Sequence, residues 1–211
     1  MAPATPDPNL ARLRAIENYI RAGRLREAAA ALAALRASAP GDVRRFLAEA
    51  LLAHAAKNPK AQIAALREAV AAAPDWLLAQ LELARALSHE GQHDDAVTMV
   101  NRAVERAPAD ETVLRTAVQI ATAAADLPVA RRHLETAWRL WPQNAGIGRE
   151  LGLCLVNLRA FEAAQAHWRA MAQAHPDDPI VIGNLGASLI ELGRRDEGIA
   201  MLERALAILP D

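Results

Sequence analysis

Apolar positions recur along this chain with a period of about 34 residues, a length at which a repeated sequence indicates an array of similar structural units. Six prolines mark the period at equal intervals: Pro40, Pro74, Pro108, Pro142, Pro176 and Pro210. Other positions keep the same register. Counted from residue 9, the twenty-fourth place of each unit holds Leu32, Leu66, Val100, Leu134, Trp168 and Leu202.

Each unit contains two amphipathic helical segments. Apolar residues at places 4, 7, 8 and 11 form the stripe of a first helix, and those at places 20, 24 and 27 form the stripe of a second. Gly23, Gly91 and Gly193 begin the break between them in three units, where a backbone that can adopt positive φ ends the first helix. The proline that closes each unit stops the second helix. The pattern therefore predicts twelve antiparallel helices and no strand.

The predicted boundaries follow from the period. A flexible segment is expected at 1–8, and one array of helical hairpins at 9–211. The six units are predicted at 9–42, 43–76, 77–110, 111–144, 145–178 and 179–211.

This pattern resembles the tetratricopeptide repeat, whose marks are a small residue at place 8, alanine at place 20 and proline at place 32. The last unit fits best, with Asn184, Leu185, Gly186, Leu189, Gly193, Leu202, Ala205 and Pro210. The unit at 43–76 departs most, because Glu49 and Gln62 stand at normally apolar places and Lys57 stands where the turn glycine belongs. The resemblance covers nearly the whole chain. It implies an all-α fold, a right-handed α-solenoid of about six hairpins, in which first helices line a concave groove.

The resemblance also implies a function. Such arrays bind segments of partner proteins in the groove, so the chain is expected to be a protein–protein interaction scaffold. The alternative is the N-terminal substrate-recruiting module of a larger bacterial enzyme, a transferase or hydroxylase, truncated at residue 211. No paired carboxylates, nucleophile motif or glycine-rich phosphate loop occurs in the sequence, so the chain itself is expected to be no enzyme and to use no cofactor.

Composition and charge narrow the partners. Aromatic residues make up only 3% of the chain, which fits helices better than strands. A formal net charge of −1 without a basic run gives no reason to expect nucleic acid. Cys154 is the single cysteine and can form no internal disulfide. With no signal-like start and no apolar run long enough for a bilayer, the expected location is the cytoplasm, with no membrane partner.

Helical geometry also predicts which residues face the groove. Places 2, 5, 6, 9 and 13 of each first helix point away from the core. Arg85, Arg115 and Arg149 occupy such places in three successive units and are predicted to form a positive track for an acidic peptide. The competing interpretation is that Glu82 and Glu150 neutralise the track.

Gln119 and Asn184 complete the candidate groove residues. Asn184 alone matches the asparagine that some members of the family carry at place 6. No three consecutive units supply the lysine, arginine and asparagine set by which some members hold chaperone C-termini, so that ligand is not expected.

Two further groups of side chains have the spacing of a functional site. His89 and His93 are separated as the ligands of a metal site on one helix would be, but the turn at Gly91 interrupts that helix, so no metal is expected. Trp138 and Trp141 share a face. Trp138 is interpreted as packing between repeats, with Trp141 half exposed, and the alternative is an aromatic anchor for a partner on the convex side.

The end of the array has its own expectation. No further helix follows to cover the apolar residues of the last unit, so truncation or self-association through the open end is expected. These residues are Leu185, Leu189, Leu202, Leu206 and Leu209.

Overall fold

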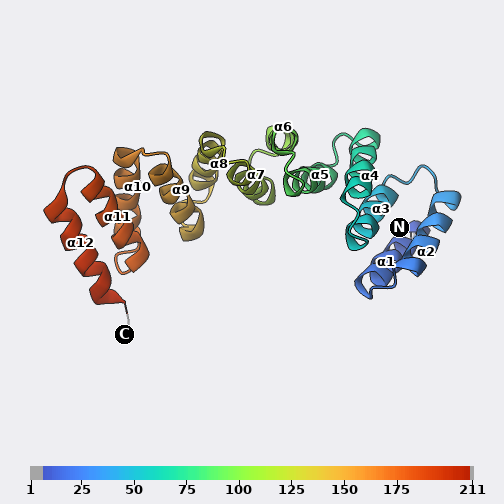
Figure 1. Cartoon of the computed structure of the whole chain (residues 1–211), viewed down its shortest axis with the longest axis horizontal. Helices are drawn as coiled ribbons and strands as arrows, with labels where there is room; N and C mark the ends of the chain where they lie inside the picture. Colours follow the sequence, from blue (N-terminus) through green and yellow to red (C-terminus); the bar gives the residue numbers. More distant parts are fainter. Residues whose placement is uncertain (1–6, 210–211) are drawn as a thin grey trace, which may run out of the picture. The chain divides into compact units, whose positions relative to one another are not determined.

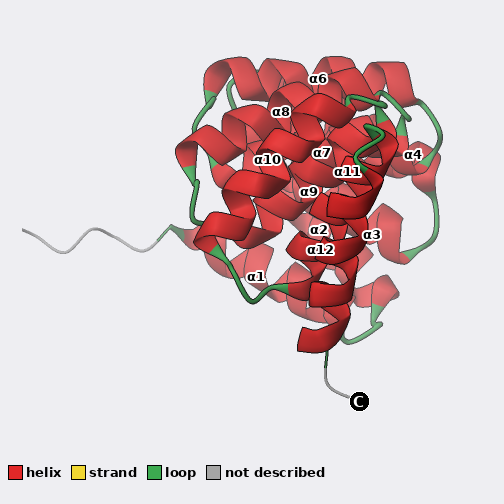
Figure 2. Ribbon diagram, turned by 90° about the vertical axis from the view of Figure 1, so that its left-hand side faces the viewer, coloured by secondary structure: helices red, strands yellow, loops and turns green. Residues whose placement is uncertain are grey.

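The computed structural model describes residues 7–209, and within them every regular element is an α-helix (Figures 1 and 2). The helices are α1 (Pro8–Arg21), α2 (Leu25–Ser38), α3 (Arg44–Ala55), α4 (Pro59–Ala72), α5 (Leu77–His89), α6 (His93–Arg106), α7 (Glu111–Ala123), α8 (Leu127–Leu140), α9 (Ala145–Asn157), α10 (Phe161–Ala174), α11 (Pro179–Glu191) and α12 (Arg195–Ile208). Each repeat of the sequence supplies two of them, so the predicted all-α array of six hairpins is confirmed.

The predicted flexible segment at 1–8 falls mostly outside the described residues. Of that segment Asp7 and Pro8 are described, and they start the first helix. The Asp7 side chain accepts a hydrogen bond from the backbone N–H of Asn9 at 2.9 Å, which caps α1, and Pro8 takes the first helical position.

Contacts between Cα atoms divide the chain into two compact units, Met1–Arg106 and Ala107–Asp211. The first unit contains the hairpins α1–α2, α3–α4 and α5–α6, and the second contains α7–α8, α9–α10 and α11–α12. Within each unit the second helix of a hairpin also packs on the first helix of the next, as α2 does on α3 and α8 on α9. First helices therefore become neighbours, and their remaining faces can share one surface.

The turn inside every hairpin has the same backbone. The six residues at place 15 all have positive φ: Gly23 71°, Lys57 54°, Gly91 73°, Ala125 55°, Arg159 57° and Gly193 77°. Each turn is closed by the same pair of hydrogen bonds. In the first, Gly23 N donates to Ile20 O at 2.9 Å and Arg24 N donates to Tyr19 O at 2.9 Å. The repeat at 43–76 thus keeps the turn of the other five although Lys57 stands where three of them have glycine.

Glu49 and Gln62, the two polar residues of that repeat that stand at normally apolar places, also have partners. Glu49 forms ion pairs with Arg45 at 2.9 Å and with Arg36 at 3.5 Å, and the Gln62 side chain lies 3.3 Å from His54 Nδ1. Because these polar groups have hydrogen-bond or ionic partners, they can stand at places that other repeats fill with apolar residues.

The core of the second unit is built around Trp168, which is fully buried in α10. Gly152 in α9 lies against the indole, and a Cβ there would collide with it. Trp138 of α8 packs against the same cluster and meets the His167 ring edge-on, with ring centroids 5.3 Å apart. Trp138 is therefore a packing residue, as the first interpretation has it.

The last hairpin is better covered than its sequence indicates. Leu185 and Leu189 of α11 are buried in the core cluster that contains Trp168, and Leu202 is half-buried. Leu206 and Leu209 are exposed. The expectation that all five leucines lack cover is wrong for the first two, because the preceding hairpin covers α11 from the other side.

No helix among residues 7–209 combines the length and the hydropathy that a membrane span requires.

Candidate functional site

A groove runs across the first helices of the first unit. It has a volume of about 530 Å³, within the ~300–1,000 Å³ that is common for ligand sites. Its walls come from α1, α3 and α5, with additions from α4 and from the segment before α5. The lining residues are Leu10, Leu13, Arg14, Glu17, Arg44, Leu47, Ala48, Ala50, Leu51, His54, Gln62, Leu66, Trp76, Leu78 and Glu82.

Three leucines give the groove its apolar surface. Leu10 of α1 is 41% exposed, Leu51 of α3 is 45% exposed and Leu78 of α5 is 49% exposed. Single exposed leucines are ordinary on protein surfaces. Here each of three neighbouring helices contributes one to the same groove.

Helical periodicity explains why these leucines point outward. Leu10 and Leu78 stand at place 2 of their repeats, and Leu51 stands at place 9 of its repeat. Both places lie on the face away from the core. Place 8 is buried in the same three helices, where it holds Ile16, Ala50 and Ala84. The sequence interpretation considered only polar residues at the outward places, and so it missed the leucines there.

Charged side chains at the rim of the groove are mostly held in place. Arg44 donates to Asp42 at 2.6 and 2.8 Å and forms an ion pair with Asp7 at 2.7 Å. The same guanidinium holds the pKa of the Asp42 carboxyl below its usual range. Glu17 pairs with Arg21 at 3.4 Å. Arg14 forms no ion pair with any residue in 7–209.

The three predicted arginines all have carboxylate partners. Arg85 pairs with Glu82 at 2.7 Å, the neutralisation that the competing interpretation expected. Arg115 pairs with Glu111 at 2.8 Å. Arg85 belongs to the first unit, whereas Arg115 belongs to the second.

Arg149 pairs with a residue from the next hairpin. Its partner is Asp178 at 3.7 Å, and its Nε also donates to Ala145 O at 3.3 Å. Glu150, expected to neutralise the track here, makes no ion pair with any residue in 7–209. The track itself stays a prediction.

The other predicted groove residues lie in the second unit. Arg115 and Glu150 line one pocket together with Trp141. Asn184 lines a separate depression with Asn157 and Phe161, and its Nδ2 donates to Ile180 O at 2.8 Å. Gln119 is exposed on α7.

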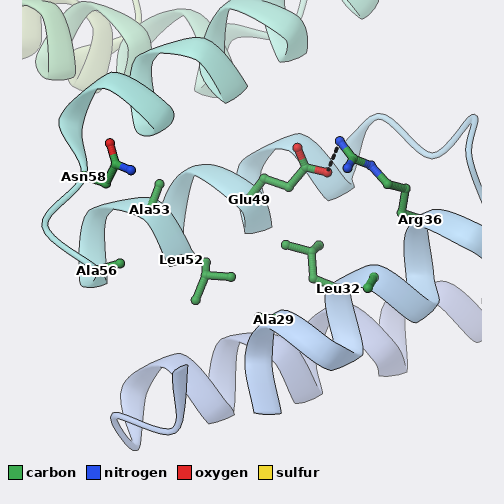
Figure 3. A pocket seen from close by; sticks show the side chains of 9 residues that line it. Ala29, Leu32, Arg36, Glu49, Leu52, Ala53, Ala56 and Asn58 are labelled. Carbon is green, nitrogen blue, oxygen red and sulfur yellow. Dashed lines mark ion pairs between the residues drawn. The ribbon is translucent and has the colours of Figure 1, made fainter. Parts of the chain in front are cut away.

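A second pocket lies between α2 and α3 (Figure 3). Three of its labelled side chains, those of Ala29, Ala53 and Ala56, are single methyl groups, and Leu32 and Leu52 lie beside them. Arg36 and Glu49 reach toward each other along its edge and are joined at 3.5 Å. A charged ligand group would have to compete there with the ion pair between Arg36 and Glu49.

Residues 7–209 contain no group of three or more His, Cys, Asp or Glu side chains that could hold a metal ion. His89, one of the two histidines with metal-site spacing, is exposed, and its Nδ1 lies 3.4 Å from Glu90.

Comparison with known families gives three matches in this chain. Models described as tetratricopeptide repeat match residues 13–76, 53–119 and 181–211. A search of curated protein sequences gives no match.

Solved structures with the same arrangement of helices are numerous. YrrB, described as a tetratricopeptide-repeat protein with an unusual peptide-binding site, is 16% identical with a TM-score of 0.66, over 85% of this chain and 93% of that one. MamA is also 16% identical, with a TM-score of 0.64, over 79% of this chain and 91% of its own. A chain of the Naa15/Naa10 complex bound to HypK-THB has a TM-score of 0.77 at 11% identity, over 96% of this chain and 33% of that one. At these identities the likeness shows the fold alone.

Proposed function

The chain belongs to the tetratricopeptide-repeat family, and on that premise we propose that it is a protein-interaction scaffold whose groove in the first unit binds an apolar segment of a partner protein. The observation that carries the proposal is the convergence of Leu10, Leu51 and Leu78 on one groove. YrrB, a relative in fold, is described as having a peptide-binding site, which adds support.

The energetics favour aliphatic side chains as the ligand. Each of the three leucines leaves roughly half of its surface in contact with water, and covering that half is worth about 1 kcal/mol. Three such contacts in a concave site can form the centre of an interface, because well-packed apolar groups there carry most of the binding energy. A segment with spaced Leu, Ile or Met residues meets this requirement.

The predicted arginine track would add an acidic partner to this picture. Such a partner has to replace Glu82, Glu111 and Asp178 on the three arginines. Exposed ion pairs are worth only about 0–1 kcal/mol, so the exchange costs little free energy. The proposal that Arg85, Arg115 and Arg149 bind an acidic segment is tested by changing all three to glutamate. Self-association through Leu206 and Leu209 is tested by sedimentation.

The experiment for the groove uses peptides selected from a random display library on the intact chain. We expect the selected peptides to be rich in large aliphatic residues. Their affinity, measured by fluorescence anisotropy, should fall about tenfold or more when Leu10, Leu51 and Leu78 are all changed to glutamine.

A matched variant controls for the loss of exposed leucines as such. Leu140, Leu153 and Leu206 are also exposed but lie outside the groove, so changing them to glutamine should leave the affinity unchanged. Equal losses in the two triple variants, or no loss in the first, would contradict the proposal.

A further inference from the structure

The pocket that contains Trp141 in the second unit has room for one side chain. Its volume is about 210 Å³, below the ~300 Å³ at which sites for whole small ligands begin. We call it the Trp141 pocket. It is lined by Glu111, Leu114, Arg115, Val118, Leu134, Ala137, Trp141, Asn144, Gly146, Ile147 and Glu150.

The walls of the Trp141 pocket are apolar and its rim is polar. Leu114 and Val118 of α7, with Leu134 of α8, are buried residues whose surfaces reach the pocket. Ile147 of α9 and Trp141, which follows α8, are half-buried. The apolar surface open to a ligand therefore comes mainly from Ile147 and the indole of Trp141.

The charges at the rim do not cancel. Arg115 donates to Glu111 at 2.8 Å, so these two neutralise each other within α7. The Glu150 carboxylate is exposed on α9 and forms no ion pair with any residue in 7–209. The pocket is thus left with one uncompensated negative charge.

The amide of Asn144 does not change this balance. Its Oδ1 already accepts hydrogen bonds from Gly146 N at 3.1 Å and from Ile147 N at 3.3 Å, which caps the start of α9. The donors at that helix end are therefore partly occupied and offer less to an anion.

We propose that the Trp141 pocket binds a lysine or arginine side chain of the partner. The aliphatic stem packs on Ile147 and the indole, while the cationic head lies beside Glu150. Long cationic side chains combine an apolar stem with a charged end in this way. The face of a tryptophan attracts cations, and a carboxylate gives a charge-assisted hydrogen bond.

This inference deepens the proposed function, on which it rests in assuming that the partner is a polypeptide. It also distinguishes partners that present a basic side chain to the pocket from partners that present an acidic one. An acidic side chain reaches Arg115 by displacing Glu111, at a cost of about 0–1 kcal/mol, whereas a basic one finds Glu150 without a competing ion pair.

The test presents single side chains to the intact chain. Nα-acetyl-lysine N-methylamide is titrated while the indole N–H of Trp141 and the methyl groups of Ile147 are followed by NMR. The norleucine compound supplies the same stem without the charge, and the glutamate compound supplies the opposite charge. We expect saturable shifts at both residues with the lysine compound, and binding about fivefold weaker or worse with the other two.

Variants assign the effect to the pocket. Glu150→Gln should remove the preference for lysine over norleucine, and Trp141→Leu should weaken lysine binding severalfold. Glu203→Gln, which alters an exposed glutamate of α12 that likewise forms no ion pair within 7–209, should leave the titration unchanged.

Several results would overturn the inference. These are the absence of lysine-induced shifts at Trp141, equal binding of norleucine, stronger binding of the glutamate compound, or an equal loss in Glu203→Gln. None of them bears on the leucine groove of the first unit, whose test uses different variants, so the two proposals fail separately.

Discussion

The indole of Trp168 occupies space that a side chain on α9 would otherwise fill. It is fully buried, and the nearest backbone position, Gly152, has no room for a Cβ. The glycine is therefore required by close packing between α9 and α10, because its φ is not in the left-handed region. In this repeat, the tryptophan at place 24 therefore fits only because place 8 is a glycine.

We predict that Gly152→Ala lowers the free energy of unfolding by about 2–3 kcal/mol, the usual cost of overpacking a rigid core. Urea denaturation measures the change. Gly183→Ala is the matched control, since this glycine is also in a first helix but its added Cβ would meet nothing closer than Ala205 Cβ at 3.9 Å. It should stabilise by about 0.5–1 kcal/mol through helix propensity. A loss in the control similar to that of Gly152→Ala would contradict the packing explanation.

At the scale of the element, the hairpin turn keeps one geometry in all six repeats, although the residue type at the turn changes. Lys57, Ala125 and Arg159 adopt the left-handed conformation that glycine adopts in the other three turns. Paired hydrogen bonds across the end of the first helix hold each of them there, as Asp126 N to Ala121 O at 2.8 Å does around Ala125. The strain is therefore maintained by the surrounding helices.

Ala125→Gly is predicted to stabilise the chain. Left-handed backbone costs a non-glycine residue about 1–2 kcal/mol, while the extra freedom of glycine in the unfolded chain offsets about 0.4–1 kcal/mol of that gain. The net expectation is about 0.5–1 kcal/mol in favour of glycine, measured by chemical denaturation. Ala124→Gly, one residue earlier with φ of −75°, should give no gain. Equal effects at the two positions would show that the turn is not strained.

Helices and turns could be predicted from the sequence because they depend on local order along the chain. The proline period and the small and large apolar places indicate where each helix starts and ends, as they do for α11 and α12 of the last hairpin. The candidate site was harder to predict. Glu82 lines the groove, but the leucines that dominate it occupy outward places where only polar residues were considered.

Ion pairs between hairpins could not be predicted from spacing within a helix. Arg149 of α9 pairs with Asp178, which caps α11 in the next hairpin, and this choice depends on how α9 meets the start of α11. Glu150 likewise forms no ion pair in residues 7–209, and its helix offers no basic residue three or four places away.

At the scale of the whole molecule, stability should depend on pH through two histidines of the second unit. Burial lowers the pKa of His167 below its ordinary value of about 6.5, although a hydrogen bond to Gly148 O at 2.7 Å opposes the shift. Burial, with help from the charge of Arg132, also lowers the pKa of His133. Both side chains are therefore neutral in the folded chain at pH values where the unfolded chain already takes up a proton.

The sign of the effect follows directly. The unfolded state binds more protons as pH falls through about 6.5, so the free energy of unfolding should decrease from about pH 7.5 to about pH 5.5. His167→Gln should reduce this decrease, because glutamine can donate to the Gly148 carbonyl without titrating. His133→Gln offers a second measurement of the same effect. If both variants keep the full dependence of the original chain, these histidines are not its source.

Many of the ion pairs described above are internal to one helix, such as Glu17 with Arg21, Glu82 with Arg85 and Glu111 with Arg115. A hairpin with this property takes its counter-charges along when its coding segment is duplicated, lost or recombined into another array. Lengthening the array by such events leaves few charges without an ionic partner. Evolution can therefore alter the number of hairpins without first rebuilding their surfaces. The exceptions are pairs between neighbouring hairpins, and a break between two such hairpins would separate them. They include Asp7 with Arg44, Arg36 with Glu49, Arg67 with Asp95 and Arg149 with Asp178. The preferred points for natural or engineered splicing are therefore junctions that no ion pair crosses.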